Sequence, residues 1–215
     1  MTEVSAARRR RSDGEQTRQR VLDAAVATIL EKGYYQASSN EIARRAGVTW
    51  GAIQHQFGTR EALLLEVLDR RWRRQLEAVA TATVVGVTLE ERLHCVLDVL
   101  ASHYAQPDHL VAILIVLDLS HNPATSAETR REMTRHGAEL EQAWQPLFAQ
   151  ALGSAASERD LVVYAFSALR GYLTGWLVST STGPRSDDTF ARDLLVRGVA
   201  STIREEAAAR GLAVG

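Results

Sequence analysis

The residues that could catalyse a reaction are few, and their spacing does not bring them together. His94, Asp98 and Ser102 have the residue types of a hydrolytic triad. Their spacing of four residues puts them in a line along one helical face, whereas a triad needs side chains that converge on one point. Asp118 and His121 could share a helical face as metal ligands, but no third ligand follows at a diagnostic spacing.

The other chemical signals for catalysis are equally weak. Cys95 is the single cysteine, so no intrachain disulfide is possible, and a buried thiol suits its context better than a nucleophile. The chain has no glycine-rich phosphate loop. The sequence therefore predicts no catalytic residue, no metal site and no cofactor, and we expect the protein not to be an enzyme.

Residues 38–57 carry a different kind of chemistry. Ala43 is the small residue that two helices need where they meet at a steep angle, and Gly47 suits the sharp turn between them. Thr49 follows the turn as a cap for the second helix. The core shared by the two helices is predicted to contain Ile42, Val48 and Ile53. This pattern indicates a helix-turn-helix, whose second helix enters the major groove of DNA.

The charge distribution supports a polyanionic partner for the N-terminal part. Residues 1–60 carry ten Lys/Arg against six Asp/Glu, and the remaining residues carry fifteen against twenty. A basic head on an acidic body suggests that the head meets a polyanion, although an arginine-rich tail that binds nothing is the alternative. The run Arg8-Arg9-Arg10-Arg11 lies in a segment, 1–14, that we expect to be disordered. We expect this arm to add affinity for DNA without sequence specificity.

The elements that position these residues are all predicted to be helices, about nine in number. Ser/Thr residues followed three positions later by an acid, such as Thr88 with Glu91 and Thr125 with Glu128, mark helix starts, and glycines such as Gly33, Gly47 and Gly153 mark helix ends. No alternating strand or hairpin is evident. The longest apolar run, Leu110 to Leu117, is far short of the roughly 20 residues of a membrane helix, and no secretory signal is evident. We therefore expect a cytoplasmic protein without membrane contact. The predicted helices are 15–32, 39–46, 50–56, 60–82, 89–105, 107–120, 125–151, 158–181 and 187–209, with Pro146 expected to kink or split the seventh.

Residues 17–68 resemble the DNA-binding region of the TetR (tetracycline-repressor) family. The resemblance rests on Val21-Leu22-Asp23-Ala24-Ala25, Gly33-Tyr34, Glu41-Ile42-Ala43, Ala46-Gly47-Val48-Thr49, Gly51, Phe57 and Arg60-Glu61-Ala62-Leu63. It implies a domain of residues 15–60 that binds DNA, followed by a helical ligand-binding and dimerisation domain of residues 61–215. Helix 60–82 would link the two.

The resemblance also implies a set of DNA-contacting residues. Ser38 and Arg60 would approach phosphates at helix N-termini, with Arg44 or Arg45 adding a further phosphate contact. Gly51 would let the backbone come close to the DNA, and Gln54 and His55 would read bases or phosphates. Two positions depart from the family, because Gln54 stands where Tyr is usual and Trp50 where Lys, Arg or Pro is frequent. Trp50 either contacts a thymine methyl or a sugar, or packs on the protein. The predicted set is Ser38, Arg44, Thr49, Trp50, Gly51, Gln54, His55 and Arg60.

For the body, the resemblance implies an inducer pocket and a dimer formed by the last two helices. Polar or aromatic groups in apolar helical surroundings are the pocket candidates, namely His103, Tyr104, His109, Asp118, Trp144, Phe148, Tyr164, Phe166 and Trp176. Apolar and small residues at helical spacing are the interface candidates, namely Leu161, Ala168, Tyr172, Gly175, Phe190, Leu194, Gly198 and Ile203. The alternative is that these stripes face the monomer's own core.

Together these expectations describe a homodimeric repressor that binds a palindromic double-stranded DNA operator and is released by a small-molecule effector. One alternative is an activator or a ligand-independent DNA-binding factor. The remote alternative is an all-helical binding module, or an enzyme, that does not bind DNA.

Overall fold

The protein is all-helical over residues 2–182 and 188–214, the part that the computed structural model describes. Its contacts divide the chain into two units. We call Met1–Arg71 with Leu110–Arg135 the head unit, and Trp72–His109 with His136–Gly215 the body unit. The division falls inside three helices, α4, α6 and α7, each of which contributes residues to both units.

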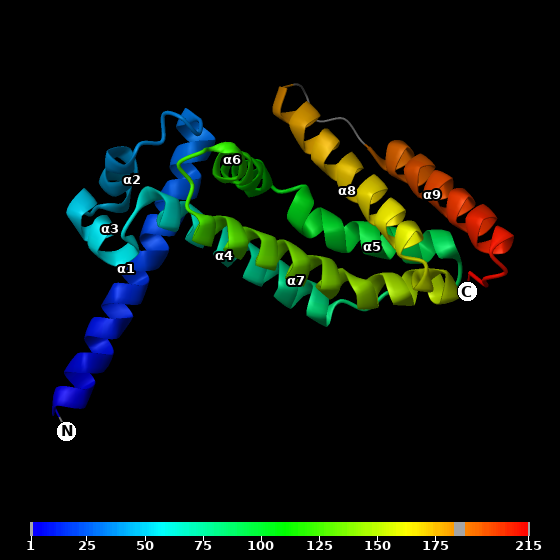
Figure 1. Ribbon diagram of the computed structural model, residues 1–215, viewed down its shortest axis with the longest axis horizontal. Coiled ribbons are helices and arrows are strands. Elements are labelled where there is room, and N and C mark those ends of the chain that lie inside the picture. Colours follow the sequence, from blue (N-terminus) through cyan, green and yellow to red (C-terminus); the bar gives the residue numbers. More distant parts are fainter. Residues whose placement is uncertain (1, 183–187, 215) are drawn as a thin grey trace. The chain divides into compact units, whose positions relative to one another are not determined.

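Each predicted helix has a counterpart in the structure, and an all-α fold is confirmed for the described residues (Figure 1). Apart from the start of the first helix, the boundaries fall within two residues of those predicted. A short 3-10 helix, Gly153–Ser157, was not predicted. The α-helices are α1 (Thr2–Lys32), α2 (Ser39–Ala46), α3 (Trp50–Phe57), α4 (Arg60–Thr81), α5 (Leu89–Tyr104), α6 (Pro107–His121), α7 (Ala127–Leu152), α8 (Arg159–Thr182) and α9 (Thr189–Ala209).

The first helix is longer than expected, because it begins at Thr2 and includes most of the segment 1–14 that was predicted to be disordered. That segment contains no proline and several residues with high helix propensity, including two alanines and a run of four arginines. A helix already formed over 15–32 extends into such a segment at little cost, since each added residue gains a hydrogen bond without a new nucleation step.

The head unit has a core formed mainly by α1, α2, α3 and α4. Helices α1 and α2 pack closely, and Ile42 and Ile53 are completely buried. The same unit includes parts of α6 and α7: the hydroxyl of Tyr34 donates to Asp118 on α6 over 2.7 Å. The carboxylate of Glu61, at the start of α4, accepts from the hydroxyl of Ser126 over 2.7 Å.

Helix α7 differs from expectation at its start and its middle. Its N-terminal hydroxyl cap is Ser126, which accepts from the backbone N–H of Thr129 over 3.1 Å, rather than the predicted Thr125, whose hydroxyl is buried. Pro146 cannot donate a backbone hydrogen bond, yet the helix continues through it to Leu152. One missing bond in a helix of 26 residues is offset by the packing of its buried face.

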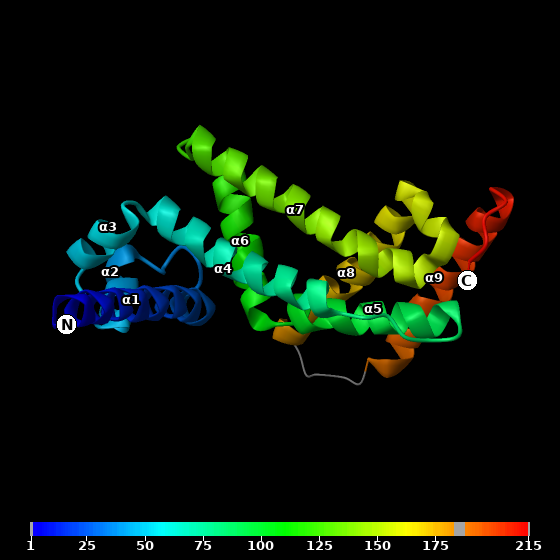
Figure 2. The ribbon, with the colours of Figure 1, turned by 90° about the horizontal axis from the view of Figure 1, so that it is seen from below.

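The body unit has its own core, in which α5 packs on both α8 and α9 (Figures 1 and 2). Helix α5 starts at a complete capping box, since Thr88 accepts from the backbone N–H of Glu91 and the Glu91 carboxylate accepts from the N–H of Thr88. Phe148, Leu93 and Leu97 are completely buried in this core.

Helix α8 is the one helix among the described residues that is long and apolar enough to cross a membrane by length and composition. One stripe of it, which includes Leu161, Leu169 and Leu173, is buried in the core of the body unit. The apolar character therefore has a structural use, although other apolar residues of α8, including Val163 and Val178, remain exposed in the single chain.

Candidate DNA-binding surface and ligand cavity

The helix-turn-helix of the head unit is fixed by two caps and one turn. The hydroxyl of Ser38 accepts from the backbone N–H of Glu41 over 3.3 Å and starts α2. Gly47 ends α2 at φ +69°, a left-handed conformation that few residues other than glycine adopt. Thr49 then starts α3 by accepting from the N–H of Ala52 over 3.2 Å. These three residues set the turn between α2 and α3.

Helix α3 presents most of its surface to solvent. Ile53 is its single buried residue among those described and anchors it to the head core. Gly51, Gln54 and His55 are exposed, while Trp50 is partly exposed at the first position of the helix. The first turn of a helix has backbone N–H groups that can bind phosphates, and the exposed amide and imidazole side chains further along α3 can bind phosphates or base edges.

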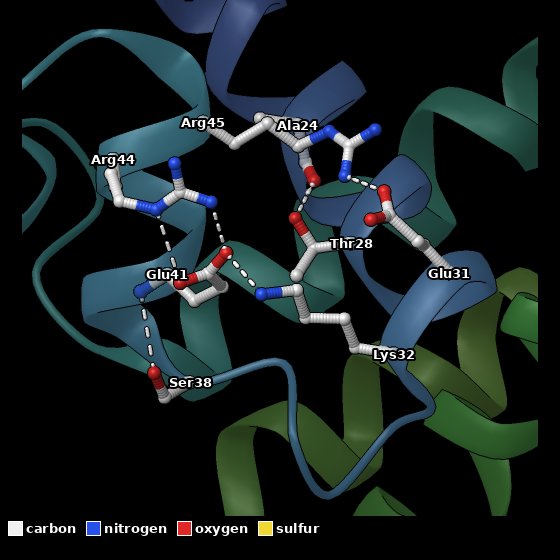
Figure 3. A network of polar contacts seen from close by, with 8 residues as sticks. All are labelled: Ala24, Thr28, Glu31, Lys32, Ser38, Glu41, Arg44 and Arg45. Atoms are coloured by element: carbon white, nitrogen blue, oxygen red, sulfur yellow. Dashed lines mark hydrogen bonds and ion pairs between the residues drawn. The ribbon is translucent and has the colours of Figure 1, made fainter.

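A network of charges connects the end of α1 with α2 (Figure 3). The carboxylate of Glu41 accepts from Arg44 over 2.5 Å and from Lys32 over 2.6 Å. These two cations, with Arg44 the stronger influence, lower the pKa of Glu41 from 4.5 to about 2. Arg45 pairs with Glu31 in the same view. The predicted phosphate contact of Arg44 would therefore compete with its bond to Glu41.

Arg60 is held by the protein in a way that the sequence did not reveal. Its Nη1 donates to the backbone oxygen of Ala37 over 2.7 Å, and its guanidinium lies 5.5 Å from the centre of the Tyr34 ring. The side chain is partly buried, so a phosphate could meet only its remaining donors. The neighbouring Tyr35 was missed by the sequence reasoning and is 92% exposed. The one indication of Tyr35 in the sequence was that it is a second aromatic residue, next to Tyr34, shortly after the end of α1.

The body unit contains a cavity of about 410 Å³ between α5, α7 and α8. Its walls are mainly aromatic and aliphatic, which is typical of small-molecule sites. Four of the nine predicted pocket residues line it, namely Tyr104, Trp144, Phe148 and Phe166. Phe166 stands at the centre of this group, with ring centroids 5.6 Å from Trp144 and 6.1 Å from Phe148.

The other five predicted pocket residues are not among the cavity's lining residues. Asp118 belongs to the head unit, where it accepts from Tyr34. Tyr164 is two residues from Phe166, so it faces another side of α8, and its hydroxyl donates to Thr202 on α9 over 3.3 Å. His109 is buried with its Nε2 3.3 Å from the hydroxyl of Thr174. The remaining two are His103 and Trp176.

The sequence reasoning missed the polar rim of this cavity. Glu141, Arg159 and Arg170 all line it. Glu141 and Arg159 form an ion pair with 2.6 Å between their atoms. The missed signal was the spacing of Arg170 four residues after Phe166, and of Glu141 three residues before Trp144, which puts charged and aromatic groups on the same helical faces.

The predicted interface residues divide into two groups. Leu161 and Ile203 pack in the core of the body unit, so their assignment to a dimer interface is corrected. Leu161 and Ile203 have the helical spacing of the other interface candidates on α8 and α9, but they lie on the faces of these helices that turn toward the core. Phe190 and Leu194 are 73% and 55% exposed, and the backbones at Gly175 and Gly198 are also exposed. Ala168 and Tyr172 are partly buried against the core.

Residues 21–67, which include the helix-turn-helix, match the model of a family described as bacterial regulatory proteins, tetR family. The chain is 32% identical over 101 residues to the fatty acid metabolism regulator protein of Bacillus subtilis, a match that covers 46% of this chain and 50% of that protein. It is 40% identical over 65 residues to the HTH-type transcriptional regulator SrpR of Pseudomonas putida, 30% of each. The chain thus spans half or less of the length of these curated relatives.

Solved structures resemble the fold over most of the chain. A transcriptional regulator from Rhodococcus sp. Rha1 has a TM-score of 0.64 at 19% identity, covering 86% of this chain and 96% of that one. The regulator FadR of Bacillus subtilis, solved in complex with stearoyl-CoA, has a TM-score of 0.54 at 21% identity with the same coverage. The helix-turn-helix segment, residues 21–67, is therefore similar to the tetR family of bacterial regulatory proteins, and the chain shares its all-helical fold with these solved structures.

Proposed function

We propose that the protein is a transcriptional repressor that binds a palindromic operator as a homodimer and is released by a small molecule. The observation that carries the proposal is the exposed face of α3, where Gln54 and His55 project from a helix anchored by the buried Ile53. A helix exposed in this way after a sharp turn suits the major groove of DNA. Helix α3 lies within residues 21–67, the segment that matches the tetR family model.

The DNA-contacting residues of the proposal are graded by their availability. Gln54, His55 and Gly51 are exposed, and the side chains of Gln54 and His55 form no hydrogen bond with the described residues, so they can meet DNA without rearrangement. Arg44 first has to share its guanidinium between Glu41 and a phosphate, and Arg60 between Ala37 and a phosphate. Ser38 and Thr49 act through the first turns they cap, whose backbone N–H groups attract phosphates. Trp50 is partly exposed and fits either a sugar contact or packing on the protein.

The dimer is supported by apolar residues that the single chain leaves uncovered on α8 and α9. Phe190 and Leu194 are the largest of these on α9, and Val163 and Val178 are exposed on α8. Gly175 and Gly198 would let a second copy's helices approach closely, because they carry no side chain. One recognition helix reads few base pairs, so two copies on a palindrome are needed for useful specificity. The proposal takes the protein to be soluble and cytoplasmic, with α8 covered by a partner helix rather than by lipid.

Release by a ligand is supported by the cavity of the body unit. Its volume of about 410 Å³ and its aromatic walls suit a small organic molecule. Three helices, α4, α6 and α7, each continue from the body unit into the head unit, so a change in the body has covalent routes to the head. The ligand must bind the form that does not fit the operator more tightly than the form that does.

The test is enrichment of a random duplex DNA library by the purified protein at about 150 mM salt, where non-specific binding is weak. We expect a palindromic consensus. The double variant Gln54→Ala, His55→Ala should abolish enrichment of that consensus while the protein remains folded. The matched control is Gln36→Ala, which removes an exposed amide outside α3 and should leave the consensus unchanged. Failure of the folded wild-type protein to enrich any sequence, also after unfolding and refolding to remove bound ligand, would contradict the proposal.

Repression itself is tested on the enriched operator placed at a promoter that drives a reporter. We expect expression to fall when the protein is present and to recover with ligand. A rise in expression would favour the alternative, an activator with the same DNA-binding head.

A further inference from the structure

The charges around the body cavity are unequal, and they indicate the kind of ligand it binds. Three charged residues line the cavity. Glu141 and Arg159 neutralise each other in an ion pair 2.6 Å long at an exposed position. Arg170 makes no ion pair with any residue that the structure describes. The cavity rim therefore carries one uncompensated positive charge, that of Arg170.

Arg170 is directed at the cavity's aromatic wall. Its guanidinium carbon lies 5.2 Å from the centre of the Phe166 ring and 6.0 Å from that of Tyr104, and both rings line the cavity. Cation–π contacts of this kind orient a guanidinium over ring faces but leave its N–H donors free for an acceptor. Arginine in such a position binds a carboxylate or phosphate through two parallel hydrogen bonds.

A second donor in the same wall has no acceptor. Trp144 lines the cavity, is 2% exposed, and its Nε1–H has no hydrogen-bond partner in the described structure. Buried donors in native proteins are nearly always paired, so an unpaired one beside a cavity indicates an acceptor that a ligand could supply. Trp144 and Arg170 flank the same ring, Phe166, from which they lie 5.6 Å and 5.2 Å respectively.

The rest of the wall excludes a highly charged or very polar molecule. Phe148, Val162 and Leu140 contribute apolar surface, and no acidic residue other than the paired Glu141 lines the cavity. A cationic ligand would meet the positive charge of Arg170 without a free carboxylate to compensate it. A neutral ligand would fill the apolar part but leave Arg170 unused.

We propose that the effector of this protein is a small organic acid whose apolar body lies against Phe166 and Phe148 and whose anionic group pairs with Arg170 at the cavity rim. The proposal rests on the proposed function in so far as it calls this molecule an effector, whereas binding of the acid to the cavity stands by itself. Two sources share this chemistry, a free carboxylic acid and the coenzyme A thioester of such an acid. A cavity of about 410 Å³ holds the acyl part of a thioester, with its phosphates outside near Arg170.

The experiment is isothermal titration calorimetry on the full-length protein with matched probes. The pairs are dodecanoic acid with dodecanamide, and 1-naphthaleneacetic acid with 1-naphthaleneacetamide, with dodecanoyl-CoA and dodecylamine added. We expect at least one acid, or the thioester, to bind about tenfold or more tightly than the amide of the same carbon skeleton, because hydrogen bonds to a charged group are the stronger ones. The amine should not bind. A thioester that binds when the free acid does not would identify the coenzyme A ester as the source.

Four variants separate the role of Arg170 from general packing. Arg170→Gln should remove the preference for the acid and leave affinity for the amide within about twofold, and Arg170→Lys should restore part of the preference. The double variant Glu141→Gln, Arg159→Gln is the matched control, because it removes the ion pair without changing the net charge of the cavity rim, and it should change the preference far less. Trp144→Phe should weaken the acid and the amide alike, since both offer an oxygen acceptor.

Each other outcome overturns the inference. Equal binding of acid and amide by the wild-type protein with no binding of the thioester, tighter binding of the amine, a larger effect of the Glu141→Gln, Arg159→Gln double variant than of Arg170→Gln, or no binding by any probe would do so. Failure of the proposed function is distinguishable from this. If an acid binds through Arg170 but leaves operator affinity unchanged, the cavity chemistry stands and the release mechanism falls. If the library yields a palindrome but no acid binds, the ligand class falls and DNA binding stands.

Discussion

The head unit and the body unit are specified by different kinds of residue. In the head, Ser38, Gly47 and Thr49 fix the backbone over a stretch of twelve residues through two caps and one left-handed turn. In the body, the cavity is formed by three helices whose contributing residues run from Tyr104 to Arg170. The first arrangement is local in sequence and the second is not.

This difference explains why residues 21–67, which include the helix-turn-helix, match a family model. A cap needs a short hydrogen-bonding side chain, and a left-handed turn needs glycine, so few residue types satisfy either position. A packed core accepts many combinations of apolar residues of similar total volume. Local geometry therefore leaves a recognisable pattern in the sequence. Core packing leaves no such pattern, but the fold it produces is still similar to solved structures at about 20% identity.

The largest effect on stability is expected from a substitution in the core of the body unit. Phe148 is completely buried, so Phe148→Ala leaves a cavity, and we expect the free energy of unfolding to fall by about 3–5 kcal/mol. The measurement is urea unfolding followed by circular dichroism at a fixed protein concentration, since a dimer's stability depends on concentration. Gln142→Ala, an exposed change on the same helix, should stay within about 0.5 kcal/mol. A loss below about 1 kcal/mol for Phe148→Ala would show that this wall of the cavity collapses freely and is not a preformed core.

A smaller effect is expected from the turn of the head unit. Gly47 has φ +69°, and a Cβ placed there meets nothing within 4 Å, so the cost of Gly47→Ala is backbone strain alone. We expect about 1–2 kcal/mol of lost stability, measured by the same unfolding experiment. Gly47→Asn should cost less, because Asn tolerates this conformation better. An unchanged stability for Gly47→Ala would mean that the turn does not fix the head in the way we describe.

Gly51 provides the matched control in the same motif. Its φ is not in the left-handed region, and an added Cβ would meet nothing closer than the Thr49 hydroxyl oxygen at 3.8 Å. Gly51→Ala should therefore raise stability by about 0.5–1 kcal/mol, as expected for a helical position. If α3 lies in the major groove, the same change should weaken operator binding about tenfold, a loss comparable to one base contact. Higher stability with unchanged operator affinity would argue that the DNA approaches another part of α3.

The sequence was most informative where structure is local. The bounds of α2 follow from a hydroxyl cap and a glycine stop, and they are Ser39–Ala46 as predicted. The start of α1 was wrong because an arginine-rich segment fits both a solvated coil and the extension of an existing helix. The cap of α7 was assigned to Thr125 because Thr125-x-x-Glu128 matches the pattern, but Ser126 is the residue whose hydroxyl is placed to receive the N–H of Thr129.

The sites were less predictable, because they depend on which helical face turns inward. Phe166 and Tyr164 look equivalent as aromatic residues of one apolar helix, yet Phe166 lines the cavity and Tyr164 contacts α9. Leu161 and Phe190 both fit an apolar stripe, and packing buries the first and exposes the second. Arg170 was overlooked because a surface arginine has no distinctive pattern until its neighbours in space are known. These distinctions follow from tertiary contacts, which one sequence does not specify.

The smallest effects on stability are expected at two charge clusters, one in the head unit and one in the body unit, whose charges are of opposite arrangement. In the head, one carboxylate, Glu41, serves two cations, Lys32 and Arg44. In the body, one cation, Arg210, serves three carboxylates, those of Glu158, Asp160 and Glu206. The pKa of Glu41 is lowered to about 2, and that of Asp160 is lowered from 3.8, in each case chiefly by an arginine. Both clusters are exposed, so salt should weaken them.

The sign of the pH dependence follows from the direction of the shift at Glu41. Its pKa is lower in the folded protein than the ordinary 4.5, so its contribution to stability is present above pH 4.5 and is lost as pH falls from there toward 2. We expect Arg44→Gln to raise the pKa of Glu41 more than Lys32→Gln does, because Arg44 donates two hydrogen bonds to it, over 2.5 and 3.2 Å. Carboxyl carbon chemical shifts followed through an NMR titration measure both, and Arg210→Gln should leave Glu41 unaffected.

The same titration connects the charge cluster with DNA binding. If Arg44 turns from Glu41 to a phosphate in the operator complex, Glu41 loses the partner that lowers its pKa most, and its pKa should rise when the operator is added. The negative charge of the operator phosphates also raises the pKa of Glu41. The Arg44→Gln variant measures this contribution by itself, because it lacks the arginine. A rise in the wild-type protein that exceeds the rise in Arg44→Gln would identify Arg44 as a phosphate contact. Equal rises in the two proteins would leave Arg44 bound to Glu41 in the complex and remove it from the DNA-binding surface.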